Sequence, residues 1–209
     1  MRPENGEGRC LKCVFVGNAA VGKTSLIVSY TTNGYSDNYV PTAFDNFSVI
    51  VLVDKKPIRL QLHDTAGQSS FDSLRPLCYS DADVFIIVYS VVDEKSFEDV
   101  RFHWWPEISK RSPGTRVILV GTQTDLRWQA RQSAVSRTRA KVLAQQMGAE
   151  HFECSALTQH NLKEMFDAAI LAGLEGETTR RNEKRRTHSK SAKIKERVQR
   201  LFNITRNLI

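Results

Sequence analysis

The sequence feature that most limits what this chain can fold into is an eight-residue loop, Gly-Asn-Ala-Ala-Val-Gly-Lys-Thr, at residues 17–24. It follows the apolar run of residues 11–16, which is typical of a buried strand, and it opens an amphipathic segment at 23–30, which is typical of a helix. Such a loop presents backbone N–H groups to one point, and the helix N-terminus also favours an anion there. The pattern predicts a phosphate-binding site; the alternative for the loop alone is a glycine turn that carries Lys-Thr by coincidence.

Two side chains at the end of the loop add to this expectation. Lys23 supplies a positive charge for the β- and γ-phosphates of a nucleotide, and the Thr24 hydroxyl is placed to bind Mg²⁺. We therefore expect the loop and the start of the helix to hold a nucleotide through Gly17, Ala19, Ala20, Val21, Gly22, Lys23, Thr24 and Ser25.

Predicted strands and helices alternate along the chain as far as residue 174. Apolar or alternating runs predict strands at 10–16, 45–53, 57–63, 84–89, 117–120 and 151–154. Helical periodicity predicts a helix that begins at 23 and further helices at 93–110, 134–147 and 161–174. This alternation predicts an α/β fold with a mostly parallel sheet, helices on both faces and a ligand at the carboxyl ends of the strands.

The sequence Asp-Thr-Ala-Gly-Gln at 64–68 follows a predicted strand directly. That position places Asp64 as the acidic partner of Mg²⁺ at the edge where the phosphate loop lies. Gly67 has no side chain, so its N–H can approach the γ-phosphate, and Gln68 beside it can orient a water for in-line attack. We expect Gln68, Lys23 and Gly67 to be the catalytic residues.

Two further loops fit recognition of a guanine base. Thr122 and Gln123 precede Asp125, whose carboxylate can accept two hydrogen bonds from the N1–H and 2-amino group of guanine. Adenine lacks that pair of donors, so Asp125 would select the base. Ser155 and Ala156 follow the last predicted strand and offer a backbone N–H for the guanine oxygen.

Together these segments resemble a Ras-superfamily small GTPase of the Rho family, and most closely its atypical Wrch/Chp-like branch. The resemblance runs from residue 10 to about residue 174. It is carried by the sequences at 39–47, 64–68, 74–77, 105–108, 121–125 and 153–159.

The resemblance implies the P-loop NTPase fold of small G proteins, with a six-stranded sheet, one antiparallel edge, and GTP or GDP with Mg²⁺ as ligands. Two segments, 35–46 and 65–80, would sense the nucleotide and bind effectors, including CRIB-type kinases, in the GTP state. Thr42 would bind Mg²⁺ and the γ-phosphate, Tyr35 would lie against the base, and Tyr39 would cover the phosphates. Exchange factors and GTPase-activating proteins are the other implied partners, and the implied role is in cytoskeletal or polarity signalling.

Several positions depart from the family pattern. Asn18 and Ala19 replace the usual Asp-Gly, Gln123 replaces a Lys, and Ser69 replaces a Glu. The connection between Arg127 and Cys154 is also too short for the full insert helix of the family. Gln123 predicts rapid nucleotide release, and Ala19 predicts a weak response to GTPase-activating proteins. A constitutively GTP-loaded scaffold is the alternative function, and an ATPase or kinase is disfavoured by the guanine-type loops.

The net charge of +7 belongs to the end of the chain. Residues 177–209 hold 11 Lys and Arg against 3 Asp and Glu, whereas residues 1–176 hold 19 against 20. We predict a disordered segment at 1–9, a GTP-binding domain at 10–176 and a basic tail at 177–209. Apolar residues recur at helical spacing among the tail's basic ones, which favours an amphipathic helix on an anionic membrane over a disordered tail and over nucleic-acid binding.

Further features of the sequence bear on the location of the protein in the cell and on its paired Cys and Trp residues. No cysteine follows Cys154, so we expect no prenylation, and no signal peptide or membrane-spanning run is visible. The predicted location is therefore cytoplasmic and peripheral on the plasma membrane. The pairs Cys10 and Cys13, and Trp104 and Trp105, are interpreted as packing residues, not as half a metal motif or a ligand platform.

Overall fold

The computed structural model describes residues 9–35, 44–130 and 133–176 of the 209-residue chain. The body of the chain as far as Leu174 forms one compact unit. Of the chain that follows it, the structure describes only Glu175 and Gly176. Residues 1–8 of the predicted disordered segment, most of one nucleotide-sensing segment and the basic tail lie outside the described residues, whereas Arg9 is part of a strand.

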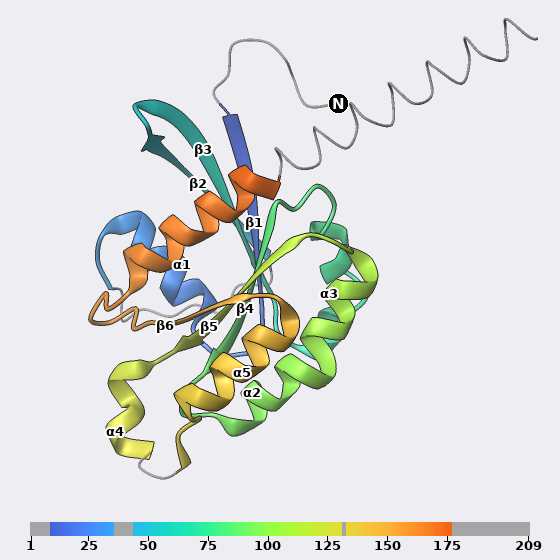
Figure 1. Ribbon diagram of the computed structural model, residues 1–209, viewed down its shortest axis with the longest axis vertical. Coiled ribbons are helices and arrows are strands. Elements are labelled where there is room, and N and C mark those ends of the chain that lie inside the picture. The colour runs from blue at the N-terminus through green and yellow to red at the C-terminus, as the bar shows by residue number, and fades with distance from the viewer. Residues whose placement is uncertain (1–8, 36–43, 131–132, 177–209) are drawn as a thin grey trace, which may run out of the picture. The chain divides into compact units, whose positions relative to one another are not determined.

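The centre of this unit is a six-stranded sheet in the order β2-β3-β1-β4-β5-β6 (Figure 1). Its strands are β1 (Arg9–Val16), β2 (Phe44–Val53), β3 (Lys56–Thr65), β4 (Val84–Ser90), β5 (Arg116–Thr122) and β6 (Glu150–Glu153). Only the pairing of β2 with β3 is antiparallel. That hairpin closes through Asp54 and Lys55, both with positive φ, as a tight two-residue turn requires. The predicted fold class is confirmed.

Helices cover both faces of the sheet. They are α1 (Lys23–Thr32), α2 (Glu94–Asp99), α3 (Trp105–Arg111), α4 (Arg127–Ala130), α5 (Arg137–Met147) and a last helix over residues 162–176. One face packs against α1 and the last helix, and the other packs against α2, α3 and α5 (Figure 1). Among the described residues, no helix is long and apolar enough to cross a membrane.

Each face has its own apolar core. Phe15 and Leu26 lie in the first core with Phe166, whose ring stacks on Tyr30 at 3.8 Å between centroids. Trp104 lies in the second core, and Cys13 is buried in the first, so the packing interpretation of both residues holds. α1 ends where Asn33 takes a left-handed conformation, which is a common way for a helix to end.

The helix predicted at 93–110 differs from the prediction in its middle. α2 and α3 are separated by a π-helical turn, η3 (Val100–Trp104), and the N–H of Trp105 bonds the carbonyl of Val100. Pro106 stands in the first turn of α3 and has no N–H to donate. A proline inside a helix removes one backbone hydrogen bond, and the wider turn accommodates that loss without ending the helix.

Short 3-10 helices fill two of the loops: η1 (Ser69–Phe71) and η2 (Arg75–Cys78) follow β3, and η4 (Thr124–Leu126) follows β5. The short connection from η4 to α5 is fixed by a buried carboxylate. Glu153 pairs with Arg127 at 2.6 Å and with Arg137 at 2.5 Å. Arg127 also donates to the carbonyl of Val135 at 2.6 Å, so both ends of this connection are tied to β6.

Candidate functional site

The loops predicted to bind the nucleotide meet at one edge of the sheet. They follow β1, β3, β5 and β6, which are mutually parallel, so their carboxyl ends point the same way. The chain adds strands first on one side of β1 and then on the other. A reversal of this kind leaves a crevice outside the carboxyl end of the central strand, which is where such sheets bind ligands.

The phosphate loop has a backbone that few residues other than glycine permit. Gly17 has a φ of 145°, and a Cβ there would lie 2.1 Å from the carbonyl oxygen of Val88. Ala20 and Gly22 also have positive φ, and α1 begins directly after Gly22. The first N–H groups of α1 therefore open onto the loop, as an anion site requires.

Lys23 is a buried cation in this loop, with a side chain 6% exposed. Its Nζ donates to the carbonyl oxygens of Gly17 at 2.9 Å and Asn18 at 2.7 Å. Burial lowers the pKa of Lys23 from 10.5 to about 8, although the negative charge of Asp64 opposes that change. A phosphate group would compensate this buried charge, so the geometry fits an anionic ligand.

Thr24 and Asp64 supply oxygen ligands suited to Mg²⁺. The Thr24 hydroxyl donates to Oδ2 of Asp64, which is buried near the end of β3. A hydroxyl and a carboxylate in contact at the start of a helix are the hard donors that Mg²⁺ prefers. Bound there, Mg²⁺ would neutralise charge on phosphate oxygens. Thr42, the third predicted metal ligand, lies outside the described residues.

The segment after β3 touches the phosphate loop through Gly67. A Cβ on Gly67 would lie 2.3 Å from the carbonyl oxygen of Gly17 and 2.4 Å from the nitrogen of Ala19, so no larger residue fits. Gln68, the predicted water-orienting residue, is exposed. Its backbone carbonyl accepts a hydrogen bond from Arg75 at 3.2 Å.

Arg75 is a functional candidate that the sequence reasoning missed. Its guanidinium is fully buried, with 0% exposure, and it also donates to the carbonyl of Ala66 at 3.0 Å. Two carboxylates complete its partners, Asp72 at 2.5 Å and Glu107 at 3.3 Å. Arg75 thus holds the backbone on both sides of Gly67, and its place in the run Leu-Arg-Pro-Leu was the available signal.

The base-recognition loops are joined by side chains. The hydroxyl of Ser155 donates to Oδ1 of Asp125 at 2.5 Å, a contact that the sequence alone did not predict. Ser155 is fully buried, and the neighbouring carbonyl of Ala156 accepts a hydrogen bond from Ser29 of α1 at 2.8 Å. The loops after β5 and β6 are therefore fixed relative to each other and to α1.

Thr122 and Gln123 attach these loops to the phosphate loop. The buried Thr122 hydroxyl lies 2.5 Å from the carbonyl oxygen of Val21. The Gln123 side-chain amide donates to the carbonyl of Ala20 at 3.3 Å and accepts a hydrogen bond from the Ser90 hydroxyl. Gln123 therefore reaches the phosphate loop although its side chain is shorter than the Lys usual there, a contact that was not predictable from the sequence.

The remaining predicted residues divide into three groups. Ala19 and Ala20 are exposed at the loop, and Ser25 is half-buried in the first turn of α1. Tyr35 is exposed at the end of a described segment, with 44% exposure. Tyr39 falls within residues 36–43 and lies outside the described part of the chain.

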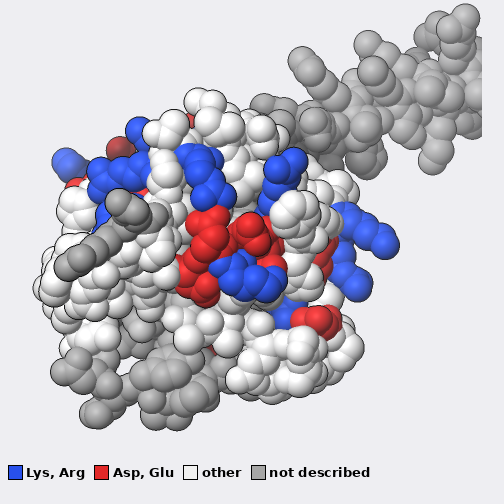
Figure 2. All heavy atoms as spheres, turned by 90° about the horizontal axis from the view of Figure 1, so that it is seen from below, with Lys and Arg blue, Asp and Glu red and all other residues white. Residues whose placement is uncertain are grey.

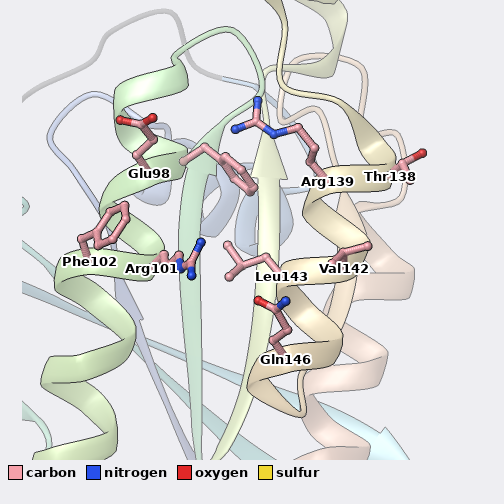
Figure 3. A pocket seen from close by; sticks show the side chains of 9 residues that line it. Glu98, Arg101, Phe102, Thr138, Arg139, Val142, Leu143 and Gln146 are labelled. Carbon is pink, nitrogen blue, oxygen red and sulfur yellow. The ribbon is translucent and has the colours of Figure 1, made fainter.

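The structure also has a groove of about 430 Å³ away from these loops (Figure 3). Glu98, Arg101 and Phe102 line it from the helix of α2 and η3, and Leu143 projects into it from α5. None of the predicted nucleotide-binding residues lines this groove. The groove is therefore separate from the loops predicted to bind the nucleotide.

Comparison with known proteins agrees with this geometry. The sequence pattern of the Ras family matches residues 12–175. The chain is 52% identical over 176 residues to the Rho-related GTP-binding protein RhoV of Rattus norvegicus, covering 79% of this chain and 75% of that protein. The chain belongs to the Rho family of Ras-like small GTPases. The proteins of the same name from Homo sapiens and Mus musculus match to the same extent.

Membership of the Rho family confirms the resemblance and the general function. A Rho-family GTPase is a switch that binds GTP or GDP with Mg²⁺ and hydrolyses GTP by phosphoryl transfer to water. Effectors, exchange factors and GTPase-activating proteins are its general classes of partner.

Proposed function

We propose that this Rho-family switch binds guanine nucleotides through the loops at the carboxyl edge of its sheet. Lys23 and the loop N–H groups hold the phosphates, Thr24 and Asp64 hold Mg²⁺, and Asp125 selects guanine. The observation that carries this assignment is that the buried Lys23, the Thr24–Asp64 pair and Asp125 all lie where parallel strands end.

In the proposed hydrolysis, Gln68 orients the attacking water while Lys23 and the N–H of Gly67 stabilise charge on the phosphoryl group. The close packing of Gly67 on Gly17 supports this, because it brings the segment of Gln68 beside the phosphate loop. The residues proposed for this site include no arginine. Intrinsic turnover is therefore expected to be slow, since an arginine finger contributes about 10³–10⁵ in rate.

Effectors, including CRIB-type kinases, are proposed to bind residues 35–46 and 65–80 in the GTP state. Two apolar side chains in the second of these segments support the proposal. Leu74 is 48% exposed and Leu77 is 74% exposed, on a segment that the fold anchors beside the phosphate loop. Exposed apolar side chains of this kind mark protein-binding surfaces when they gather in one segment.

The basic tail at 177–209 is proposed to hold the protein peripherally on an anionic membrane at the cytoplasmic face. The support is its sequence, which carries the excess positive charge, whereas residues 1–176 are close to neutral. On the face drawn in Figure 2, acidic side chains gather beside basic ones, so that face does not supply a uniformly basic surface. We assign the attraction to the tail because the excess positive charge of the chain lies there.

A GTP-loaded scaffold with negligible turnover is the second candidate. Ala19 favours it, because its backbone lies against Gly67 and its side chain adds bulk beside the proposed γ-phosphate position. The nucleotide bound to the purified protein separates the candidates. GDP supports a cycling switch, GTP supports the scaffold, and an adenine nucleotide would contradict both.

A further inference from the structure

The side chain of Asn18 connects the phosphate loop to the helix formed by α2, η3 and α3. Its Oδ1 accepts a hydrogen bond from the indole Nε1 of Trp104 at 2.7 Å. Its Nδ2 donates to Oδ2 of Asp99, also at 2.7 Å. Asn18 therefore bridges two residues that lie more than eighty positions further along the chain.

The chemistry of the two partners determines what residue 18 must offer. An indole N–H can only donate, and an ionised carboxylate can only accept. Residue 18 must therefore accept on one side and donate on the other, which is what an amide does. An aspartate at position 18 would keep the bond to Trp104 but would set two carboxylates against each other at Asp99.

The main chain of Asn18 takes part in the phosphate site itself. Its carbonyl oxygen accepts the 2.7 Å hydrogen bond from Nζ of Lys23. Its carbonyl carbon lies 2.3 Å from the position that a Cβ of Gly67 would occupy, so the Asn18 peptide is in close contact with Gly67. Any displacement of Asn18 therefore moves the acceptor that orients Lys23 and the surface on which Gly67 rests.

The other partner of this link is rigid. Trp104 is 1% exposed and ends the π-helical turn, a distortion often found at functional sites. The guanidinium of Arg75 lies 4.5 Å from the centre of the Trp104 ring. Because Arg75 holds the carbonyls of Ala66 and Gln68, one indole ring contacts the anchors of both phosphate-site segments.

We infer that Asn18 is a positioning residue of the phosphate site, which it fixes through Trp104 and Asp99. The inference rests on the proposed nucleotide site and adds a residue to it. Loosening the link lets the loop carbonyls and Lys23 move away from the phosphates. Nucleotide release should therefore accelerate before the fold itself is lost.

The test exchanges the donor and the acceptor. Asn18→Asp is expected to speed release of a fluorescent GDP analogue about tenfold, since it replaces a charge-assisted hydrogen bond with a like-charge contact. Asn18→Asp combined with Asp99→Asn restores the bond with its direction reversed and keeps the net charge. This exchanged pair should release GDP within about threefold of the wild-type rate. Glu98→Gln, a neutralisation on the same helix without contact to the loop, is the matched control.

A pH series separates positioning from general destabilisation. In Asn18→Asp, one carboxyl of the pair has a raised pKa and takes up a proton as the pH falls. The hydrogen bond to residue 99 then forms again, so the ratio of release rates between Asn18→Asp and the exchanged pair should fall toward one as the pH is lowered. Lys95 and His103 on the helix also face Asp99, and both proteins carry them.

The result is interpreted together with thermal unfolding of the same proteins. Faster release in Asn18→Asp that the exchanged pair reverses supports the inference. Wild-type release in Asn18→Asp, or an exchanged pair that recovers stability but still releases GDP rapidly, would overturn it. If the wild-type protein binds no guanine nucleotide, the proposed function and the inference are both wrong. A variant comparison that fails while the wild type binds guanine nucleotide contradicts the inference alone.

Discussion

Ser155 donates its hydroxyl to Oδ1 of Asp125 at 2.5 Å, which joins the loop after β6 to the loop after β5. The same hydroxyl accepts a hydrogen bond from the N–H of Thr158 at 3.1 Å, so its proton is directed toward the carboxylate. Asp125 is thus oriented by a residue whose own orientation is fixed. The remaining acceptor positions of the carboxylate are the ones a guanine base would use.

Base selection is the first prediction. Asp125→Asn should weaken guanine-nucleotide binding by about 2–3 kcal/mol, because a bidentate contact to a charged acceptor is lost. It should shift preference toward xanthine, whose 2-oxo group needs a donor.

Ser155→Ala should weaken guanine binding by about 1 kcal/mol, because Asp125 loses its orienting partner. Competition assays with GTP, XTP and ATP measure this, with Asp54→Asn in the β2–β3 turn as control; equal affinity for ATP and GTP in the wild type would contradict it.

Nucleotide exchange is expected to be rapid, because Gln123 meets the phosphate loop through a single neutral contact of 3.3 Å. Gln123→Ala should release GDP still faster, since it removes that contact to Ala20. Gln123→Lys should slow release, because a longer charged side chain covers the base and reaches the loop. Dissociation of a fluorescent GDP analogue tests all three proteins. A wild-type rate as slow as that of an ordinary Rho protein would count against the prediction.

The response to GTPase-activating proteins should be weak. By analogy with the Rho family, the side chain of Ala19 would extend into the space that the γ-phosphate, Gln68 and an incoming arginine finger share. Because the finger contributes about 10³–10⁵ in rate, blocking it matters more than slowing the intrinsic step. Ala19→Gly should restore at least part of the stimulation in single-turnover assays with a Rho GTPase-activating protein. Strong stimulation of the wild type would refute the prediction.

Membrane binding should depend on the tail and on anionic lipid. Each Lys or Arg near such a surface is worth about 1 kcal/mol, so the several in residues 177–209 together can hold the protein on the membrane. Leu201→Glu should reduce binding because it places a charge on the apolar side of the predicted helix. Added salt should weaken the attraction between the basic residues and the anionic lipid. Phosphorylation of Thr187, Ser189 or Ser191 should act in the same direction.

Sedimentation with neutral and acidic liposomes measures this binding. The full-length protein should pellet with acidic liposomes only, and residues 1–176 should remain in the supernatant. Equal pelleting of the two proteins would show that residues 177–209 are not what binds the membrane.

Acid should destabilise the fold partly through His151. Its Nε2 lies 3.0 Å from the Tyr89 hydroxyl, and burial holds the pKa of His151 below 6.5. The unfolded chain binds this proton near pH 6.5 but the folded protein binds it only at lower pH, so the free energy of unfolding falls as the pH drops below 6.5. Denaturant unfolding at pH 7.5 and 5.5 should show a smaller loss in His151→Gln than in the wild type. The exposed His160→Gln should lose as much as the wild type.

The sequence predicted the sheet and the order of its loops because strand and helix periodicities are local. The phosphate loop was recognisable for the same reason, since its glycines and Lys23 act within eight residues. Predicted element boundaries shifted by a few residues, as with α5, which begins at Arg137 and not near 134. The roles assigned to the site residues, Tyr39 and Thr42 among them, and to the tail stay predictions.

The contacts between distant segments were not predictable from periodicity. Asn18 was noticed only as a departure from a pattern, whereas its two partners lie at positions 99 and 104. Trp104 was correctly interpreted as a core residue, but a core assignment says nothing of where an indole N–H points. The π-helical turn that carries it depends on Pro106, whose effect on a helix can be a kink, an end or a widened turn.

The burial of Arg75 also limits how the segment after β3 can rearrange. Four acceptors surround one guanidinium that has no access to water, and three of them belong to residues 66–72. If one of those residues moved alone, a charged N–H group of Arg75 would stay buried without an acceptor, which costs several kcal/mol. Gradual deformation is therefore disfavoured, and the segment should change conformation in a single cooperative step that frees all of its contacts with Arg75 together.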